Sequence, residues 1–310
     1  MCIRDRLHVA CNYRRADVAS FLVTLPVCDI NSVDNAGNTP LHRAIHADLD
    51  NLACLLCEAG ADVRAANSQL RTPLHEAIRS GSENVIRTLL ARGCDVNAMT
   101  STVSATTPFL TAIFYYKISM RSSEYGKSLD TILRLLIEAG CRLSQGDSQW
   151  TPLSASIDID KSFVASLVLF NGCRFQRSYT NRAYSRSLLV EAFTRCETYV
   201  VKLLVLCGYQ PTLDEVDQCT RRIPSFSPLF YRISGSERAA MRTRNELLNW
   251  LRLRASCAPS LMELSRTCVR LALNHAAGDT SILKRIQELP VPSVMRRYVS
   301  LGDFAENVLL

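Results

Sequence analysis

Apolar residues in the first two thirds of the chain recur at helical spacing, in short blocks that each end near a glycine. Leucine pairs at 55–56, 89–90, 135–136 and 203–204 lie on one predicted face of a helix in each block. A left-handed residue is expected to end these helices, at Gly60, Gly93, Gly140, Gly172 and Gly208. One such block cannot bury its own apolar face, so the pattern predicts helical units stacked in a row.

A period of 33 residues relates these blocks. Thr39-Pro-Leu-His42 recurs as Thr72-Pro-Leu-His75, and each Thr-Pro precedes its glycine by 21 residues. Thr is expected to cap the first helix of a block, with Pro at the first helical position. The period and the motif resemble those of ankyrin repeats, and the resemblance implies that the motif histidines bond to neighbouring backbone. About six repeats are expected between Leu7 and Pro211, the first of them truncated, and the copy from Thr107 to Gly140 carries an insertion of about 12 residues around Tyr115 to Lys127.

The C-terminal part contains a different pattern. Leu261, Leu264, Ser265, Arg266 and Val269 follow the order Leu-x-x-Leu-Cys-Arg-x-x-φ, where φ is apolar, with Ser265 in place of Cys. Further along the chain comes Leu289-Pro290-Val291-Pro292. This ending resembles a SOCS box. The resemblance implies elongin C binding by Leu261, Leu264, Ser265 and Val269, and docking of a cullin-5 type cullin by residues 289–292.

Ser265 is a departure from the family pattern. A hydroxyl buried without a partner costs about 1–3 kcal/mol, which would weaken elongin C binding about fivefold to a hundredfold. A Ser that finds a backbone acceptor would avoid this cost. An alternative interpretation of the whole segment is a three-helix cap that closes the hydrophobic end of the repeats.

Taken together, the chain resembles the ankyrin repeat and SOCS box family from Leu7 to Leu301. The resemblance implies an all-α fold, an ankyrin solenoid followed by a three-helix SOCS box. Met1 to Arg6 run into Leu7 without a Thr-Pro start, so these six residues are expected to be a non-native leader. The expected organisation is leader 1–6, ankyrin repeats 7–211, linker and bridging helix 212–254, SOCS box 255–301 and tail 302–310.

The resemblance implies a substrate receptor without catalytic residues, cofactor or metal. Its expected partners are elongin B/C, cullin-5 with its RING partner, and an unknown target protein. Two alternatives remain open: a non-catalytic scaffold whose degenerate SOCS box no longer recruits a ligase, and an enzyme that uses a cysteine as a thiol carrier. The second lacks a Cys/His pairing in the sequence.

Target contacts are expected at hairpin-tip and first-helix positions of the repeats. By register these are Asn35, Asn38, His46, Ser68, Arg71, Arg79 and Trp150. Trp150 is interpreted as an exposed aromatic anchor, or as a cover for the neighbouring insertion, and Tyr115 and Tyr116 carry the same two interpretations.

The cysteines, the net charge and the apolar runs limit which kinds of site and partner the chain is expected to have. The chain has 13 cysteines, and Cys28, Cys94, Cys141 and Cys173 all take the Ala place after or near the block-ending glycine, which favours small buried side chains. Cys54 and Cys57 form a C-x-x-C without a second pair at zinc spacing. The net charge of +7 favours acidic partners or a solvated basic face, but no nucleic-acid-reading pattern accompanies it. No apolar run is long enough for a membrane span, so a soluble cytoplasmic protein is expected.

Overall fold

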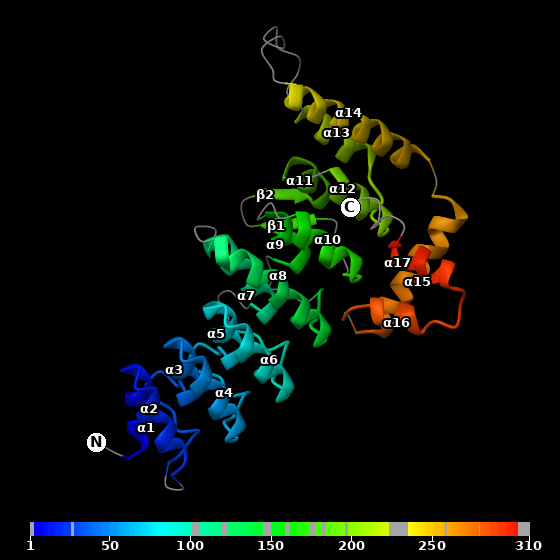
Figure 1. The fold of residues 1–310 in the computed structure, drawn as a ribbon. Coiled ribbons are helices and arrows are strands. Elements are labelled where there is room, and N and C mark those ends of the chain that lie inside the picture. Colours follow the sequence, from blue (N-terminus) through cyan, green and yellow to red (C-terminus); the bar gives the residue numbers. More distant parts are fainter. Residues whose placement is uncertain are drawn as a thin grey trace. The chain divides into compact units, whose positions relative to one another are not determined.

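The computed structural model describes residues 3–25, 28–100, 106–119, 123–144, 150–158, 162–173, 178–181, 184–195, 198–222, 235–257, 259–278 and 280–302. They form two compact units, residues 1–141 and 142–310 (Figure 1). The predicted all-α class is confirmed, with one short β-hairpin added. Among the described helices, none has both the length and the apolar character that crossing a bilayer requires.

The first unit consists of helix pairs. First helices pack on first helices and second helices on second helices, so that two parallel rows build up along the unit. The helices described there are α1 (Ile3–Asn12), α2 (Ala16–Val23), α3 (Pro40–His46), α4 (Asp50–Glu58), α5 (Pro73–Ser80), α6 (Glu83–Ala91), α7 (Pro108–Ser119) and α8 (Ser123–Glu138).

The repeated motif starts the first helix of a pair as predicted. Thr39 caps α3 in a capping box with His42, and Pro40 occupies the first turn. The second ring nitrogen of His42 lies 3.0 Å from the carbonyl oxygen of Arg71, in the next hairpin. His75 makes the same contact with Thr106 at 3.3 Å. The motif histidines therefore join neighbouring repeats, as the resemblance implied.

The insertion between Thr107 and Gly140 lengthens both helices of its pair. Helices α7 and α8 have 12 and 16 residues, compared with 7 and 9 in α3 and α4. Both keep their place in the two rows, because α7 packs on α5 and α8 packs on α6. The side chain of Tyr116 lies outside the described residues.

The second unit continues with helix pairs and ends in three further helices. Its elements are α9 (Pro152–Asp158), α10 (Ser162–Phe170), β1 (Ser178–Asn181), β2 (Tyr184–Ser187), α11 (Leu188–Arg195), α12 (Thr198–Leu206), α13 (Leu213–Arg221), α14 (Gly235–Ser256), α15 (Leu261–Ala276), α16 (Leu283–Glu288) and α17 (Ser293–Ser300). The hairpin β1–β2 is antiparallel and pairs Ser178 with Ser187.

The segment 212–254, expected as a linker and bridging helix, contains a helix pair of its own. Helix α13 packs on α11, and α14 packs on both α13 and α12. Thr212 caps α13 in a capping box with Glu215. This helix escaped the repeat pattern because Thr212 is followed by neither Pro nor the motif His. Leu247, Leu248 and Leu251 are buried on one side of α14.

Candidate functional site

Helix α15 carries the motif predicted to bind elongin C. Hydrogen bonds between residues of its own first turn fix where this helix begins. The backbone N–H of Glu263 donates to Ser260 Oγ at 3.2 Å, and the backbone N–H of Ser260 donates to the Glu263 carboxylate at 3.0 Å. Arg254, at the end of α14, pairs with the same carboxylate at 2.5 Å. Burial raises the pKa of Glu263, but the hydrogen bonds from Arg254 and Ser260 outweigh it and lower the pKa. An ionised Glu263 thus links α14 to the first turn of α15.

The half of α15 that does not pack on the rest of the chain carries large apolar side chains exposed to solvent. The exposed side chains are Met262, Leu264, Val269 and Leu271. Ser265 is also exposed, and its hydroxyl donates to the Met262 carbonyl oxygen at 2.8 Å. The side chain of Leu261 lies outside the described residues. An apolar helix face without a partner indicates a protein interaction surface.

The Leu-Pro-Val-Pro element connects α16 to α17 in an extended form. Leu289 ends α16 with φ −62° and ψ 134°, and Pro292 precedes α17 with φ −53° and ψ 149°. Leu289 is half-buried, whereas Pro290, Val291 and Pro292 are exposed. Because proline fixes its own φ, the element is held ready for a docking contact without further ordering.

The opposite face of α15 is buried and polar. Arg266, Arg270 and Asn274, spaced four residues apart, are 8%, 4% and 3% exposed. Arg270 donates to the Leu169 carbonyl oxygen at 3.0 Å and to the Val299 carbonyl oxygen at 2.8 Å. These acceptors belong to the last turns of α10 and α17, where helix carbonyls lack intrahelical partners and the helix dipole is negative.

Close backbone contacts reinforce this attachment of the C-terminal helices. Gly172 has φ +83°, and a Cβ added there would meet the Ile282 side chain at 2.6 Å. Gly208 has φ +110°, and its Cβ would meet Thr267 at 2.6 Å. Ile282, 0% exposed, also donates its backbone N–H to the Asn171 carbonyl oxygen at 3.1 Å. Helices α15 to α17 are thereby held against the carboxyl ends of α10 and α12, while the apolar face of α15 stays free.

Two predicted target contacts meet in the first unit. Arg71 and Arg79 both pair with the buried carboxylate of Glu76, at 3.5 and 2.8 Å. All three line a cavity of about 220 Å³, together with His75, Thr100, Thr106, Thr111, Phe114 and Tyr115. Burial lowers the pKa of His75 to about 4, although the hydrogen bond to Thr106 and nearby Glu76 oppose the shift. The ring is therefore neutral, and the cavity presents two guanidinium groups around one carboxylate.

The other predicted target contacts are more scattered. Asn35 and His46 are exposed. Asn38 is half-buried, and its side chain is used internally, since its amide oxygen accepts from Asn67 at 3.0 Å. Ser68 is exposed and its backbone N–H pairs with Ala36. Trp150, expected to be exposed, is half-buried and belongs to the second unit.

Comparison with protein families assigns both ends of the chain. A family model of ankyrin repeats, in three copies, matches residues 7–100, and a model of the SOCS box matches residues 257–300. No curated protein matches the chain. The order of these two domains decides the type of protein. The chain is an ankyrin repeat and SOCS box protein.

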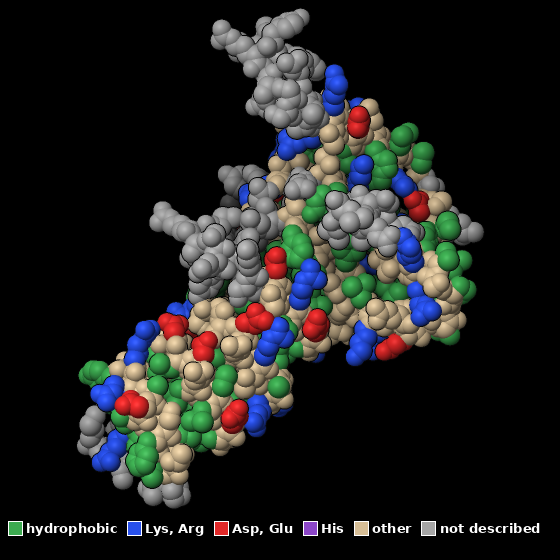
Figure 2. Space-filling model, viewed as in Figure 1, with side chains coloured by type: hydrophobic (Ala, Val, Ile, Leu, Met, Phe, Trp, Pro, Cys, Tyr) green, Lys and Arg blue, Asp and Glu red, His purple; other side chains and the backbone are tan. Residues whose placement is uncertain are grey.

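Both domains of this ankyrin repeat and SOCS box protein are interaction modules and not catalytic domains. The combination makes it a substrate-recognition adaptor for cullin-RING ubiquitin ligases in general. Helices α15 to α17 lie within the residues that match the SOCS box. Basic and acidic side chains are interspersed over the face drawn in Figure 2, which favours a mixed-charge protein surface over a single-sign patch.

The cysteines behave as packing residues. Cys94, Cys141 and Cys173 are buried and unbridged, whereas Cys28 is only half-buried. Burial raises the pKa of Cys94 to about 11 and that of Cys141 to about 12. A thiol with a raised pKa is a poor nucleophile at neutral pH, which argues against a thiol-carrier role for these residues. Within the described part of the chain, no three His, Cys, Asp or Glu residues are grouped as metal ligands would be.

Sequence reasoning missed the residues that anchor the SOCS box and shape the target cavity. No role was predicted for Arg270 and Asn274, although their spacing from Arg266 places three polar residues on one helical face. Glu76 gave no signal either, because its burial between two arginines depends on the stacking of α5 and α7.

Proposed function

We propose that this protein joins elongin B/C and cullin-5 through its SOCS box and presents a target protein held by its ankyrin repeats. The observation that carries this proposal is the exposed apolar face of α15 on a helix whose other face is anchored. Each apolar side chain fully buried by a partner contributes about 1.5–3 kcal/mol. Leu261, Leu264, Ser265 and Val269 are proposed as elongin C contacts on this face.

The cullin contact is proposed at Leu289, Pro290, Val291 and Pro292. Three of these four side chains are exposed in an extended segment, which supports a docking role. The RING partner of the cullin and its conjugating enzyme would carry out the transfer. This chain would supply proximity, by raising the effective concentration of a target lysine near the activated ubiquitin.

The target side of the proposal rests on the surface that includes Arg71, Arg79, Asn35, Asn38 and His46. Two arginines around the buried Glu76 leave one net positive charge at the 220 Å³ cavity. Tyr115 adds an aromatic wall there. Trp150 is proposed as a separate contact on the second unit.

Co-purification tests the ligase side directly. The full chain, co-expressed with elongin B/C, is compared with Leu264→Asp and with Leu253→Asp, a matched control because Leu253 is an exposed leucine on α14. Loss of elongin B/C from the first variant alone supports the proposal. A variant with Pro290 and Pro292 replaced by Ala should keep elongin B/C and capture less cullin-5.

The scaffold alternative gives a different result in the same experiment. If Ser265 has disabled the SOCS box, the unmodified chain will fold and capture no elongin B/C. The hydrogen bond from Ser265 to the Met262 carbonyl argues against that outcome. The hydroxyl already has an acceptor within α15, so its burial against a partner leaves no donor unpaired.

A further inference from the structure

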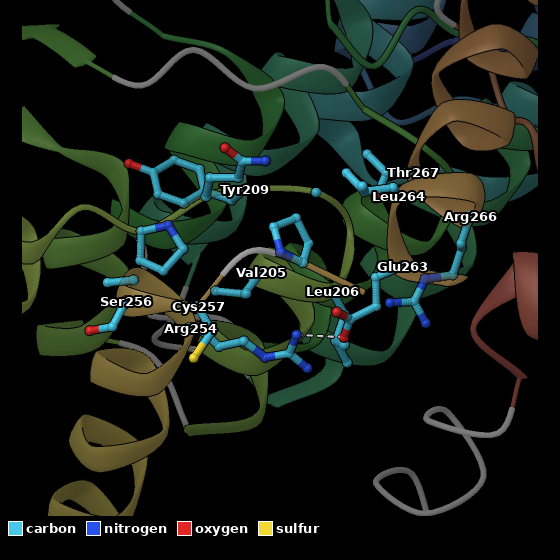
Figure 3. Close-up of a pocket in the computed structure, with 15 residues that line it drawn as sticks. Val205, Leu206, Tyr209, Arg254, Ser256, Cys257, Glu263, Leu264, Arg266 and Thr267 are labelled. Carbon is cyan, nitrogen blue, oxygen red and sulfur yellow. Dashed lines mark ion pairs between the residues drawn. The ribbon is translucent and has the colours of Figure 1, made fainter. Parts of the chain in front are cut away.

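A cavity of about 330 Å³ lies where the last ankyrin-type helices meet the start of the SOCS box, within the second unit. Its walls come from the end of α12 and the following loop, the end of α14, and the first turns of α15 (Figure 3). Of its lining residues only Leu264 belongs to the proposed elongin C contacts, and none lines the target cavity. The volume is at the lower end of the range of ligand pockets.

Arg266, which lines this cavity, is a buried arginine with an unpaired nitrogen. Its side chain is 8% exposed, and its Nε has no hydrogen-bond partner. Figure 3 shows the side chain among the cavity-lining residues beside Glu263. The guanidinium carbon lies 4.9 Å from the centre of the Tyr298 ring, which stabilises the charge by a cation–π contact but pairs none of its N–H groups. Within the described residues it has no ion pair. Buried charges are normally paired, so the arrangement calls for an anion.

The other charged groups of the cavity define the charge of that anion. Arg254 and Glu263 pair with each other at 2.5 Å and neutralise one another. Arg266 therefore contributes the one uncompensated charge. Val205, Leu206, Pro211 and Leu264 add apolar surface to the lining. A single negative charge on a compact apolar body fits this combination better than a phosphate, which carries up to two charges at neutral pH.

From these observations we infer that the cavity binds a monocarboxylate with a compact apolar body, whose carboxylate pairs with Arg266. A free organic acid and the C-terminal residue of a peptide share this chemistry. The guanidinium fork suits a carboxylate because it offers parallel donors at fixed spacing. The inference goes beyond ligase recruitment and concerns the chain alone.

The test measures binding of defined probes to the full chain without elongin B/C, so failure of the ligase proposal would not affect it. The free-acid probe is 3-phenylpropanoate, with neutral 3-phenylpropanamide as its control. The peptide probe is acetyl-Gly-Gly-Phe with a free carboxylate, compared with its C-terminal amide. Dissociation constants come from isothermal titration calorimetry, supported by saturation-transfer NMR.

At least one carboxylate probe should bind about tenfold or more tightly than its amide, since a charge-assisted hydrogen bond is lost in the amide. The probe that binds identifies the source as a free acid or a peptide terminus. Arg266→Met should weaken that binding about tenfold or more. Arg285→Met, an exposed arginine on α16, should leave it unchanged.

Leu206→Trp supplies a second test that leaves Arg266 in place. The larger side chain should fill the cavity and weaken binding to the same extent, which keeps the inference testable if Arg266→Met fails to fold. Equal affinity for acid and amide would overturn the inference. So would unchanged binding in either folded variant, or failure of both carboxylate probes to bind.

Discussion

The side chain of Arg270 donates through Nη2 to the carbonyl oxygen of Leu169 at 3.0 Å, a contact that spans 101 residues of sequence. Its Nη1 donates to the carbonyl oxygen of Val299 at 2.8 Å. One buried cation thus donates to carbonyls in the last turns of both α10 and α17. This arrangement couples the SOCS box to the helix pair that ends at Gly172.

Replacing Arg270 by Met should loosen the SOCS box. The change removes the donor to the Val299 carbonyl and one of the donors to the Leu169 carbonyl, which also accepts from the Gly172 N–H at 3.2 Å, so the free energy of unfolding of the second unit should fall by about 2–4 kcal/mol. Amide hydrogen exchange in α15 and urea unfolding measure the effect. Arg285→Met is the control, because that side chain is exposed. A loss below about 0.5 kcal/mol, the range of ordinary surface substitutions, would contradict this role.

Gly172→Ala and Gly140→Ala form a matched pair. The two glycines have φ +83° and +85°, but an added Cβ meets Ile282 at 2.6 Å at Gly172 and nothing within 4 Å at Gly140. Both substitutions should cost about 1–2 kcal/mol for a left-handed alanine, and Gly172→Ala should cost about 1–3 kcal/mol more for overpacking. Thermal unfolding is monitored by amide hydrogen exchange, which reports the stability of each of the two units individually. If the extra cost reflects the clash, Ile282→Ala should reduce the effect of Gly172→Ala.

Ser265→Cys restores the residue of the family pattern. The Ser265 hydroxyl is already bonded to the Met262 carbonyl, so it carries no unpaired donor into an interface. We therefore expect elongin C affinity to rise by less than about tenfold. The gain comes only from the free energy of burying a more apolar side chain in the interface. Surface plasmon resonance on both proteins gives the ratio. A gain of about a hundredfold would mean that the hydroxyl loses its hydrogen bond in the complex.

The buried motif histidines should make the ankyrin repeats sensitive to acid. Burial lowers the pKa of His42, and it lowers that of His75 to about 4. Unfolded histidine has a pKa near about 6.5 and binds a proton that the folded residue rejects. Stability is therefore fully present above about pH 6.5 and is lost as the pH falls toward about 4, by up to about 3 kcal/mol for His75.

Urea midpoints measured between about pH 7.5 and 4 test this pH dependence. His75→Gln should reduce the slope of stability against pH in this window, even if it lowers stability at the neutral end. The control His46→Gln changes an exposed histidine and should leave the slope unaltered. An unchanged slope in His75→Gln would show that titrating groups other than His75 cause the loss of stability in acid.

Local patterns were enough for much of the fold. Thr39, Pro40 and His42 act within one helical turn, so the start of α3 was readable from the chain. The positive φ of Gly60 and Gly208 followed equally from local backbone preference. Helix α13 was missed for the same reason, since its cap at Thr212 uses Glu215 and lacks the Pro and His of the motif.

The sequence by itself determined the repeat period, the helix starts that carry the Thr-Pro motif, the helix ends at glycine, and the two motifs of the SOCS box, because each depends on neighbours within a few residues. Only the tertiary structure decided which face of α15 stays free. That choice depends on Arg270 reaching carbonyls of α10 and α17, and on Ile282 packing against Gly172. The burial of the Arg266 Nε without a hydrogen-bond partner likewise results from packing. Contacts between residues a hundred positions apart depend on how helices stack, and no local pattern encodes that.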